Sequence, residues 1–354
     1  MSSSVQVLDR IGYAQVVGSA GGGSANAGWF GDGSDGDLVV TGDTPLEVAL
    51  DEGQIVKQYN NLTIQQGGIL RPANRCNGMI LLVKGNLTLN GTISVEKCAP
   101  LLNSNETEAV KEKHIVLCGS MTGGNGGGGG ASSNNSAQYR LTPGTGGAGF
   151  ALGGGFGGGS AAGDGQGPSS KYYWGYNGGN GDPRPPIGTP IPYPSPTGVG
   201  KTTMYGVGGS GTHAGEGVVG GSGPGGSGAA LIYDSPNLIK AHGNNGDAIG
   251  GGALWIFVKG KVRINTTGKI TANGGAGAKG AYAAKNNAAN TSGGGGGAGG
   301  GIIVLVHTGD YINQGSITAN GGSGGERATT SITCYAGEDG TAGAVKVCNI
   351  NELT

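Results

Sequence analysis

Three aspartates stand close together near the start of the chain, in the segment "GDGSDGD" (residues 31–37). Asp32, Asp35 and Asp37 offer carboxylate oxygens, the ligands that Ca²⁺ prefers. The segment departs from the EF-hand loop, because Asp37 stands where that loop requires a glycine. The alternative is a tight turn that introduces a strand at residues 38–40. Calcium binding and a structural turn are therefore both open.

A second acidic group lies near the end of the chain, where Glu326, Glu338 and Asp339 are close in sequence. Glycoside hydrolysis needs two carboxyl groups about 5–9 Å apart, and a stacked repeat fold can bring distant acids into one groove. The four histidines are scattered, and the chain contains neither HExxH nor GxSxG. We therefore predict a non-enzymatic protein without catalytic residues or cofactors, and keep a polysaccharide hydrolase as an alternative.

The segment "SPTGVGKTT" (residues 195–203) resembles a phosphate-binding loop, but Ser195 stands where the motif requires its first glycine. Proline-rich sequence precedes it and glycine-rich sequence follows, so neither the strand nor the helix of such a loop is expected. The formal net charge is -1 and no basic block occurs. These observations argue against nucleotide and nucleic-acid binding.

Residues 169–205 combine aromatic side chains with prolines. Proline fixes φ and stiffens a loop, and aromatic rings offer rigid amphipathic contact area. A stiff aromatic loop on a regular scaffold is where binding is expected. The alternative is that the rings pack against the chain's own scaffold or a neighbouring subunit. The candidate receptor-binding residues are Tyr172, Tyr173, Trp174, Tyr176, Tyr193 and Tyr205.

Glycine dominates the composition, with 84 of 354 residues, against a usual level of about 7%. The glycines do not recur strictly at every third position, which excludes collagen. Hydrophobic residues make up 35% of the chain and form short runs between turn residues, which favours an ordered protein. Glycine runs can order as polyglycine-II-like helices that hydrogen-bond to one another, and a flexible spacer is the alternative.

No apolar stretch reaches the roughly 18 residues that span a membrane, so membrane insertion is not expected. The N-terminus lacks the charged and apolar regions of a signal peptide. The five cysteines form no CxxC pair, which argues against zinc. We interpret them as small buried hydrophobic residues. They are Cys76, Cys98, Cys118, Cys334 and Cys348.

Internal repeats are the strongest structural signal. Residues 254–277 and 302–324 share the ending "ITANGG", which aligns Ile270 with Ile317, and we align Val258 with Val306. Residues 62–70 align with residues 87–95, 25 positions later. Each copy joins a short aliphatic run, a glycine or polar corner and a short alternating strand, and residues 343–350 read as a final partial copy.

Short strands between glycine corners cannot bury a face alone, but they can when stacked. We therefore predict an all-β chain, a β-solenoid or β-helix of stacked short strands with polyglycine-II-like segments and almost no helix. The segment "SGGGGGAGGGIIVLV" (residues 292–306) is then a glycine run that enters a strand.

The repeats divide the chain into four predicted parts. Residues 1–50 form an N-terminal entry or attachment segment, and residues 51–120 a first solenoid part. Residues 121–250 form a glycine-rich region that carries the aromatic loop. Residues 251–354 form the C-terminal solenoid repeats.

The segments "GWFGDGSDGDLVVTGDTPL" (residues 28–46), "YNNLTIQQGGILRP" (residues 59–72) and "ILLVKGNLTLNGTISV" (residues 80–95) resemble glycine-rich β-helical proteins of bacteriophage virions. The likeness covers about the first hundred residues. The glycine runs separately resemble the tail-fibre-tip adhesins of T-even phages, in which polyglycine-II helices pack and the loops between them contact the host.

The resemblance implies a virion structural protein that is a tail-fibre or tail-tip component. Its partners would be other virion proteins and a glycan or protein of the host surface, and it would assemble as a homotrimer. A capsid-decoration or fibre-shaft protein is the structural alternative, and a polysaccharide-degrading tailspike is the enzymatic one.

Overall fold

The computed structural model describes residues 30–50, 53–100, 122–129, 146–149, 153–154, 157, 225, 230–234, 237–241, 244, 246–285, 288–328 and 334–350. Within these ranges the regular structure is almost entirely strand, and no α-helix occurs. The same ranges accordingly contain no helix long and apolar enough to cross a membrane.

Fifteen strands form three sheets of five strands, and every strand pairs in parallel with its neighbours. The first sheet contains, in spatial order, β1 (Leu38–Val40), β4 (Leu62–Ile64), β7 (Leu87–Leu89), β12 (Val262–Ile264) and β17 (Tyr311–Asn313). The second sheet contains β2 (Asp43–Leu46), β5 (Ile69–Pro72), β8 (Thr92–Ser94), β13 (Lys269–Thr271) and β18 (Ser316–Thr318). The third contains β3 (Ile55–Tyr59), β6 (Met79–Val83), β11 (Ala253–Val258), β16 (Ile302–His307) and β19 (Ala344–Asn349).

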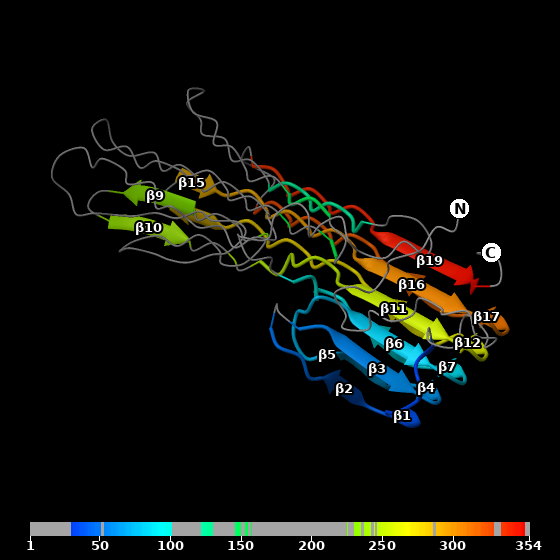
Figure 1. Cartoon of the computed structure of the whole chain (residues 1–354). Coiled ribbons are helices and arrows are strands. Elements are labelled where there is room, and N and C mark those ends of the chain that lie inside the picture. Colours follow the sequence, from blue (N-terminus) through cyan, green and yellow to red (C-terminus); the bar gives the residue numbers. More distant parts are fainter. Residues whose placement is uncertain are drawn as a thin grey trace.

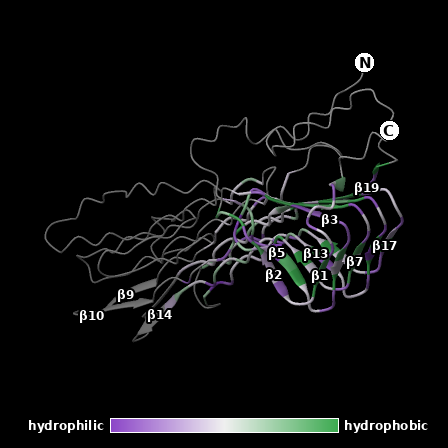
Figure 2. Cartoon of the chain, turned by 60° about the horizontal axis from the view of Figure 1, so that its bottom comes forward, coloured by the Kyte–Doolittle hydropathy of each residue, from purple (hydrophilic) through white to green (hydrophobic). Residues whose placement is uncertain are grey.

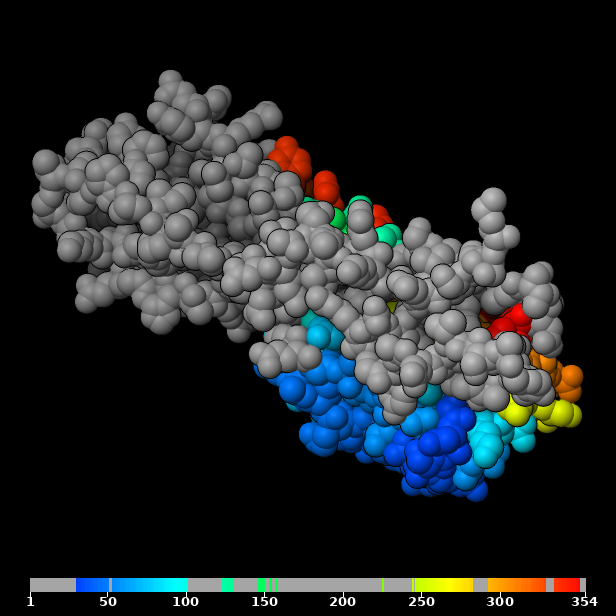
Figure 3. All heavy atoms as spheres, viewed as in Figure 1, coloured from blue at the N-terminus to red at the C-terminus, as the bar shows by residue number. Residues whose placement is uncertain are grey.

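The chain visits the first, second and third sheets in turn, and we call each such circuit a passage. Successive passages stack in sequence order, from β1, β2 and β3 at one end to β19 at the other (Figure 1). The surface view shows the same order, with the blue first passage and the orange and red last strands at opposite ends (Figure 3). The prediction of an all-β chain of short, stacked strands is confirmed at this level.

The pairing corrects two details of the predicted repeat alignment. Ile270 pairs with Ile317 as predicted, but Val306 pairs with Phe257 and not with Val258. A one-residue slip exchanges the two faces of a strand, and here both faces are apolar, so the sequence pattern did not reveal the slip. Leu70 pairs with Ile93, 23 residues on, because the corner after β7 is shorter than the corner after β4.

Apolar side chains from all three sheets meet inside the stack and form the inner core. Aligned residues of successive passages make columns, such as Leu81, Ile256 and Leu305 in the third sheet, each with no exposed surface. Hydrophobic and hydrophilic segments alternate around the passages (Figure 2). Burial of a leucine or isoleucine side chain stabilises a fold by about 1.5–3 kcal/mol, so these columns are the main source of stability in the stack.

The third sheet is buried on its outer face as well. Trp255, Phe257 and Val304 alternate with the inner-core residues and form a second apolar cluster, which includes Phe30 and Ile350. Burial on both faces explains why β11 and β16 are continuous aliphatic or aromatic runs and not alternating strands.

Glycine runs leave the second sheet and return to the third. After β13 the chain runs outward through residues 272–281 to the antiparallel hairpin of β14 (Tyr282–Lys285) and β15 (Ala288–Thr291). It then returns through residues 292–301 to β16. A second antiparallel hairpin, β9 (Ala230–Asp234) and β10 (Asn237–Ala241), lies beside the first at the end of the molecule away from the parallel sheets (Figure 1).

The returning run 292–301 is fully buried, and its backbone hydrogen bonds repeat every three residues. The amides of Gly294, Gly297 and Gly300 donate to the carbonyls of residues 335, 338 and 341 at 2.9–3.1 Å. The intervening residues 295, 298 and 301 donate in another direction, to residues 278, 275 and 272 at 2.7–2.9 Å. The run therefore has partners on several sides, which argues against a flexible spacer. We call the hydrogen-bonded runs together the glycine bundle.

Candidate functional site

The aspartate-rich loop 31–37 lies along the free edge of β3. Asp35 N–H donates to the Gln58 carbonyl at 2.8 Å, and Asn60 N–H donates to the Gly36 carbonyl at 2.7 Å. Gln58 N–H donates to Asp35 Oδ2 at 2.6 Å. The loop thus satisfies backbone groups of an edge strand that would otherwise be open to another chain.

The three carboxylates of this loop bind different groups. Asp32 Oδ1 accepts the N–H of Ser34 at 2.8 Å. Hydrogen bonds from the Ser34 side chain and then from its backbone lower the pKa of Asp32. Asp37 Oδ1 accepts both the N–H and the side-chain amide of Asn61, each at 3.0 Å. The predicted turn before a strand at residues 38–40 is confirmed by β1.

No group of three or more His, Cys, Asp or Glu side chains is placed to hold a metal ion in the described part of the chain. Calcium at Asp32, Asp35 and Asp37 stays a prediction. The observed contacts instead give each carboxylate the role of a hydrogen-bond acceptor for the backbone or a neighbouring side chain.

Lys57 continues an inner-core column at the same end of the stack, where its side chain is 38% exposed. It is in register with Leu81, which in turn pairs with the fully buried Ile256. Its ammonium lies 3.5 Å from Asp35 Oδ1. A charge in the column of an edge strand discourages pairing with a further strand. This role was not predicted from the sequence, although the lysine within the apolar strand "IVKQY" was a signal for it.

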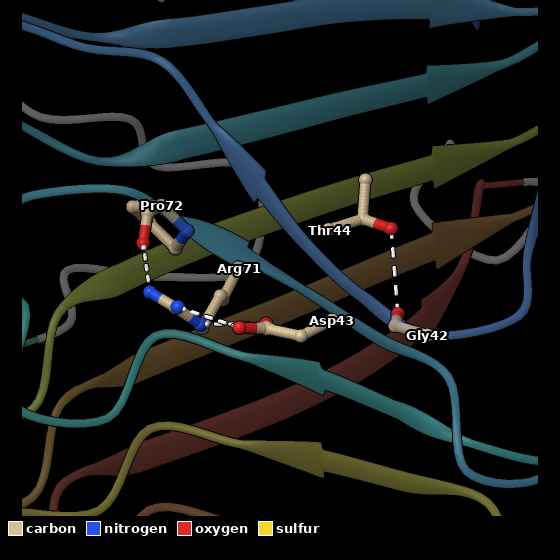
Figure 4. Close-up of polar contacts among 5 residues, drawn as sticks. All are labelled: Gly42, Asp43, Thr44, Arg71 and Pro72. Atoms are coloured by element: carbon tan, nitrogen blue, oxygen red, sulfur yellow. Dashed lines mark hydrogen bonds and ion pairs between the residues drawn. The ribbon is translucent and has the colours of Figure 1, made fainter.

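Acid–base pairs connect adjacent passages on the outer surface. Arg71 clamps Asp43 with two bonds of 2.8 Å and donates a third to the Pro72 carbonyl, beside the bond from Thr44 to the Gly42 carbonyl (Figure 4). The hydrogen bond from Arg71 lowers the pKa of Asp43. A similar ion pair joins Lys261 to Asp310 at 3.3 Å.

Asparagine side chains connect passages at the corners. Asn61 Oδ1 accepts the N–H of Asn86 at 2.9 Å, and Asn86 Oδ1 accepts the N–H of Lys261 at 2.8 Å. At the next corner Asn265 donates to Asn90 Oδ1 at 2.7 Å. These ladders satisfy corner amides that no strand partner reaches.

The acids considered for hydrolysis each contact a different part of the glycine bundle. Glu326 pairs with Lys279 at 3.1 Å. Glu338 Oε2 accepts the N–H of Gly128 at 3.1 Å, and Asp339 Oδ1 accepts the N–H of Gly324 at 2.7 Å. These contacts hold neighbouring runs together and give the hydrolase alternative no support.

Two exposed tyrosines stand where glycine runs end, far from the parallel sheets. Tyr282 is 48% exposed and begins β14, where it pairs with Thr291. Tyr335 is 56% exposed, and its carbonyl accepts the N–H of Gly294, three residues after Thr291. Neither tyrosine was predicted as a candidate from the sequence, because the two lie 53 positions apart and outside the aromatic loop.

We call the end of the glycine bundle that carries Tyr282, Tyr335 and the two hairpins the distal end. The predicted aromatic loop 169–205, with its candidate receptor-binding residues, lies outside the described residues. Those residues stay a prediction.

The structure bears on the interpretation of the cysteines as small buried residues. Cys348 is buried, and it is also disulfide-bonded. Cys76 and Cys334 are buried, as expected, and Cys98 is partly buried.

Comparison with protein-family models, with curated proteins and with solved structures gives no match to this chain.

Proposed function

We propose that this chain is a non-enzymatic virion protein of the bacteriophage tail-fibre or tail-tip type, which recognises the surface of the host cell. In fold terms, we propose a β-solenoid joined to a bundle of polyglycine-II-like helices. The stacked parallel passages support the first part of this fold, and the hydrogen-bond period of three supports the second.

One observation carries the functional proposal: the glycine bundle connects the stacked parallel sheets to an exposed distal end. The glycine bundle is bonded throughout by its backbone, so it needs no apolar side chains to extend from the sheets. It presents Tyr282 and Tyr335, both about half exposed, at its distal end. Exposed aromatic rings on a rigid support suit contact with a sugar or protein surface.

Recognition would then work by rigid display. The sheets would join the other virion proteins, and the distal end would meet the host, together with the predicted loop 169–205. A fibre-shaft or decoration protein is the second candidate, and burial of Tyr282 and Tyr335 in a subunit interface would favour it.

Adsorption of purified protein to candidate host cells tests the proposal. We expect wild type to bind one host and the double variant Tyr282→Ala/Tyr335→Ala to lose at least about tenfold in affinity, which corresponds to 1.4 kcal/mol. Ile312→Ala is the matched control, because Ile312 is 45% exposed on β17, within the parallel sheets. Trp174→Ala/Tyr176→Ala tests the predicted loop in the same assay.

Equal binding of wild type and both double variants would refute recognition by this end. Wild type that binds no host cell, but assembles with other virion proteins, would favour the shaft or decoration role.

A further inference from the structure

The sequence "ITANGG" occurs twice, in residues 270–275 and 317–322, so Asn273 and Asn320 have the same local sequence. Each stands directly before a glycine. An asparagine in this position is open to deamidation, in which the backbone nitrogen of the next residue attacks the side-chain amide. Glycine favours the attack because it carries no Cβ to hinder its own nitrogen. The two copies differ only in their surroundings, so each serves as the reference for the other.

At the first copy, all the groups that would react are held by hydrogen bonds. Asn273 Oδ1 accepts the N–H of Asn320 at 2.8 Å, and Asn273 Nδ2 donates to Glu96 Oε1 at 2.7 Å. Gly274 N–H donates to the Asn320 carbonyl at 2.9 Å. Attack of the Gly274 nitrogen on the Asn273 side chain must therefore break these hydrogen bonds, which slows the reaction.

The second copy lacks the corresponding bonds because it belongs to the last passage. It begins in β18, which is the last strand of the second sheet, so no later corner of the described stack lies against it. Within the described residues, neither the Asn320 side chain nor the Gly321 N–H takes part in a hydrogen bond. Asn320 is also exposed to solvent. Both reacting groups are therefore available, and water can reach them.

The lack of a partner for the Gly321 N–H has a cause in the facing run 334–343, which is antiparallel to it. Three residues after Gly321, the N–H of Gly324 donates to Asp339 Oδ1 at 2.7 Å. The antiparallel order places Ala342, three residues after Asp339, opposite Gly321. Alanine offers no side-chain acceptor, so this N–H is left without the bond that Gly324 has.

We propose that Asn320 deamidates in the folded protein, while hydrogen bonds protect its sequence counterpart Asn273. This inference goes beyond the proposed virion role and does not depend on it. The Gly321 nitrogen gives its proton to solvent and attacks Asn320 Cγ. A bond from this nitrogen to Cγ forms, the bond from Cγ to Nδ2 breaks, and Nδ2 takes one proton from solvent and leaves as ammonia. Water then adds to either carbonyl of the resulting succinimide ring and opens it to aspartate or isoaspartate.

One restraint on this reaction stays in place in the folded chain. The Asn320 carbonyl must leave the Gly274 N–H while the ring closes, so Asn320 reacts more slowly than in an unfolded chain. Aspartate then adds a negative charge at the exposed corner of the last passage. Isoaspartate also adds one carbon atom to the backbone, which displaces the glycine run after it from its hydrogen-bond period.

Peptide mapping of the full chain tests the proposal. The protein is incubated at pH 8, sampled over time and digested with trypsin, which releases Asn273 in residues 270–279 and Asn320 in residues 286–327. Mass spectrometry with fragmentation follows the replacement of each amide by an acid. We expect Asn320 to convert at least about tenfold faster than Asn273, which corresponds to about 1.4 kcal/mol of protection. In concentrated urea the two rates should become equal, because the local sequences are the same.

Two variants sharpen the comparison. Glu96→Ala removes the acceptor of Asn273 Nδ2, so it should raise the Asn273 rate severalfold and leave the Asn320 rate unchanged. Glu47→Ala is the matched control, because Glu47 is another exposed acid, directly after β2, and it should change neither rate.

Equal rates at Asn273 and Asn320 in folded wild type would overturn the proposal, and so would conversion of Asn320 that occurs only in urea. Both outcomes are measured on wild type, so they hold even if a variant fails to fold. An Asn273 rate that stays unchanged in folded Glu96→Ala would overturn the protective role of the hydrogen bonds.

Discussion

The inner core of the sheets and the run 292–301 of the glycine bundle are both buried, but they differ in what fills them. In the sheets, columns such as Leu81 and Ile256 fill the interior with apolar side chains. In the bundle, the interior of run 292–301 is almost free of side chains, and neighbouring backbones bond directly. The first region is stabilised by the removal of apolar surface from water, and the second by satisfied hydrogen bonds at close approach.

This difference implies opposite tolerances to substitution. A truncated core side chain leaves a cavity, and the surroundings can relax partly around it. An added side chain in the bundle has no space, because a Cβ placed on Gly297 would lie 2.1 Å from the Gly322 carbonyl oxygen. The core should therefore lose stability gradually with the volume removed, and the bundle should lose it abruptly with a single methyl group.

The largest effect is expected for Gly297→Ala. The methyl group must push two runs apart and break buried backbone hydrogen bonds, which should cost at least about 4 kcal/mol of unfolding free energy. Urea unfolding measures this loss. Gly42→Ala is the control, because a Cβ there meets nothing within 4 Å, and it should change stability by under about 0.5 kcal/mol. Similar losses for both variants would show that the bundle is loosely packed.

An intermediate effect is expected for Leu81→Ala in the inner core. Loss of burial and a residual cavity should cost about 2–5 kcal/mol by the same urea measurement. Val39→Ala provides the contrast, since Val39 is 54% exposed on β1 and should change little. A loss at Leu81 no larger than that at Val39 would mean that the columns do not carry the stability of the stack.

The smallest effect on stability is expected for the surface ion pair Asp43–Arg71, which joins two adjacent passages of the parallel sheets. Because Arg71 lowers the folded-state pKa of Asp43 below its ordinary value of 3.8, the pair stabilises the fold above that value. This contribution is lost as pH falls through the lower folded-state pKa. Asp43→Asn should therefore flatten the decrease in the urea midpoint below pH 4.

Thr44→Val is the matched control for this pH effect, because it removes a neighbouring hydroxyl bond and keeps the carboxylate. It should retain the acid-range slope of wild type. If the urea midpoint of Asp43→Asn fell with pH as steeply as that of wild type, the Asp43–Arg71 pair would not contribute to holding the passages together.

The sequence allowed the stacked strands to be predicted because their pattern is local and repeated. The pairing of Ile270 with Ile317 followed from a shared motif, and residues 344–349 joined the stack as the expected last copy. The register of β16 was less accessible, since apolar residues on both faces remove the alternation that marks a strand face. The hairpins were missed because "YAAKNNAANT" (residues 282–291) lacks the alternating apolar pattern of a strand.

The site was less predictable than the fold for a physical reason. Asp32, Asp35 and Asp37 have the composition of a cation site, and only three-dimensional placement shows that they accept hydrogen bonds from other residues. Tyr282 and Tyr335 become neighbours of the same strand end only after two glycine runs pack side by side. The spacing of residues along the sequence reveals neither the hydrogen bonds of the three aspartates nor the proximity of the two tyrosines.

The hydrogen-bond period of three in run 292–301 has a consequence for how such a protein can change length. An insertion of three residues in every run of the bundle at the same level would return each donor to an equivalent acceptor and leave the sheets unchanged. At about 3.1 Å per residue, each such step would lengthen the reach of the distal end by about 9 Å. The length of the bundle can therefore change in steps of three residues per run, without changes to the parallel sheets or to the distal end.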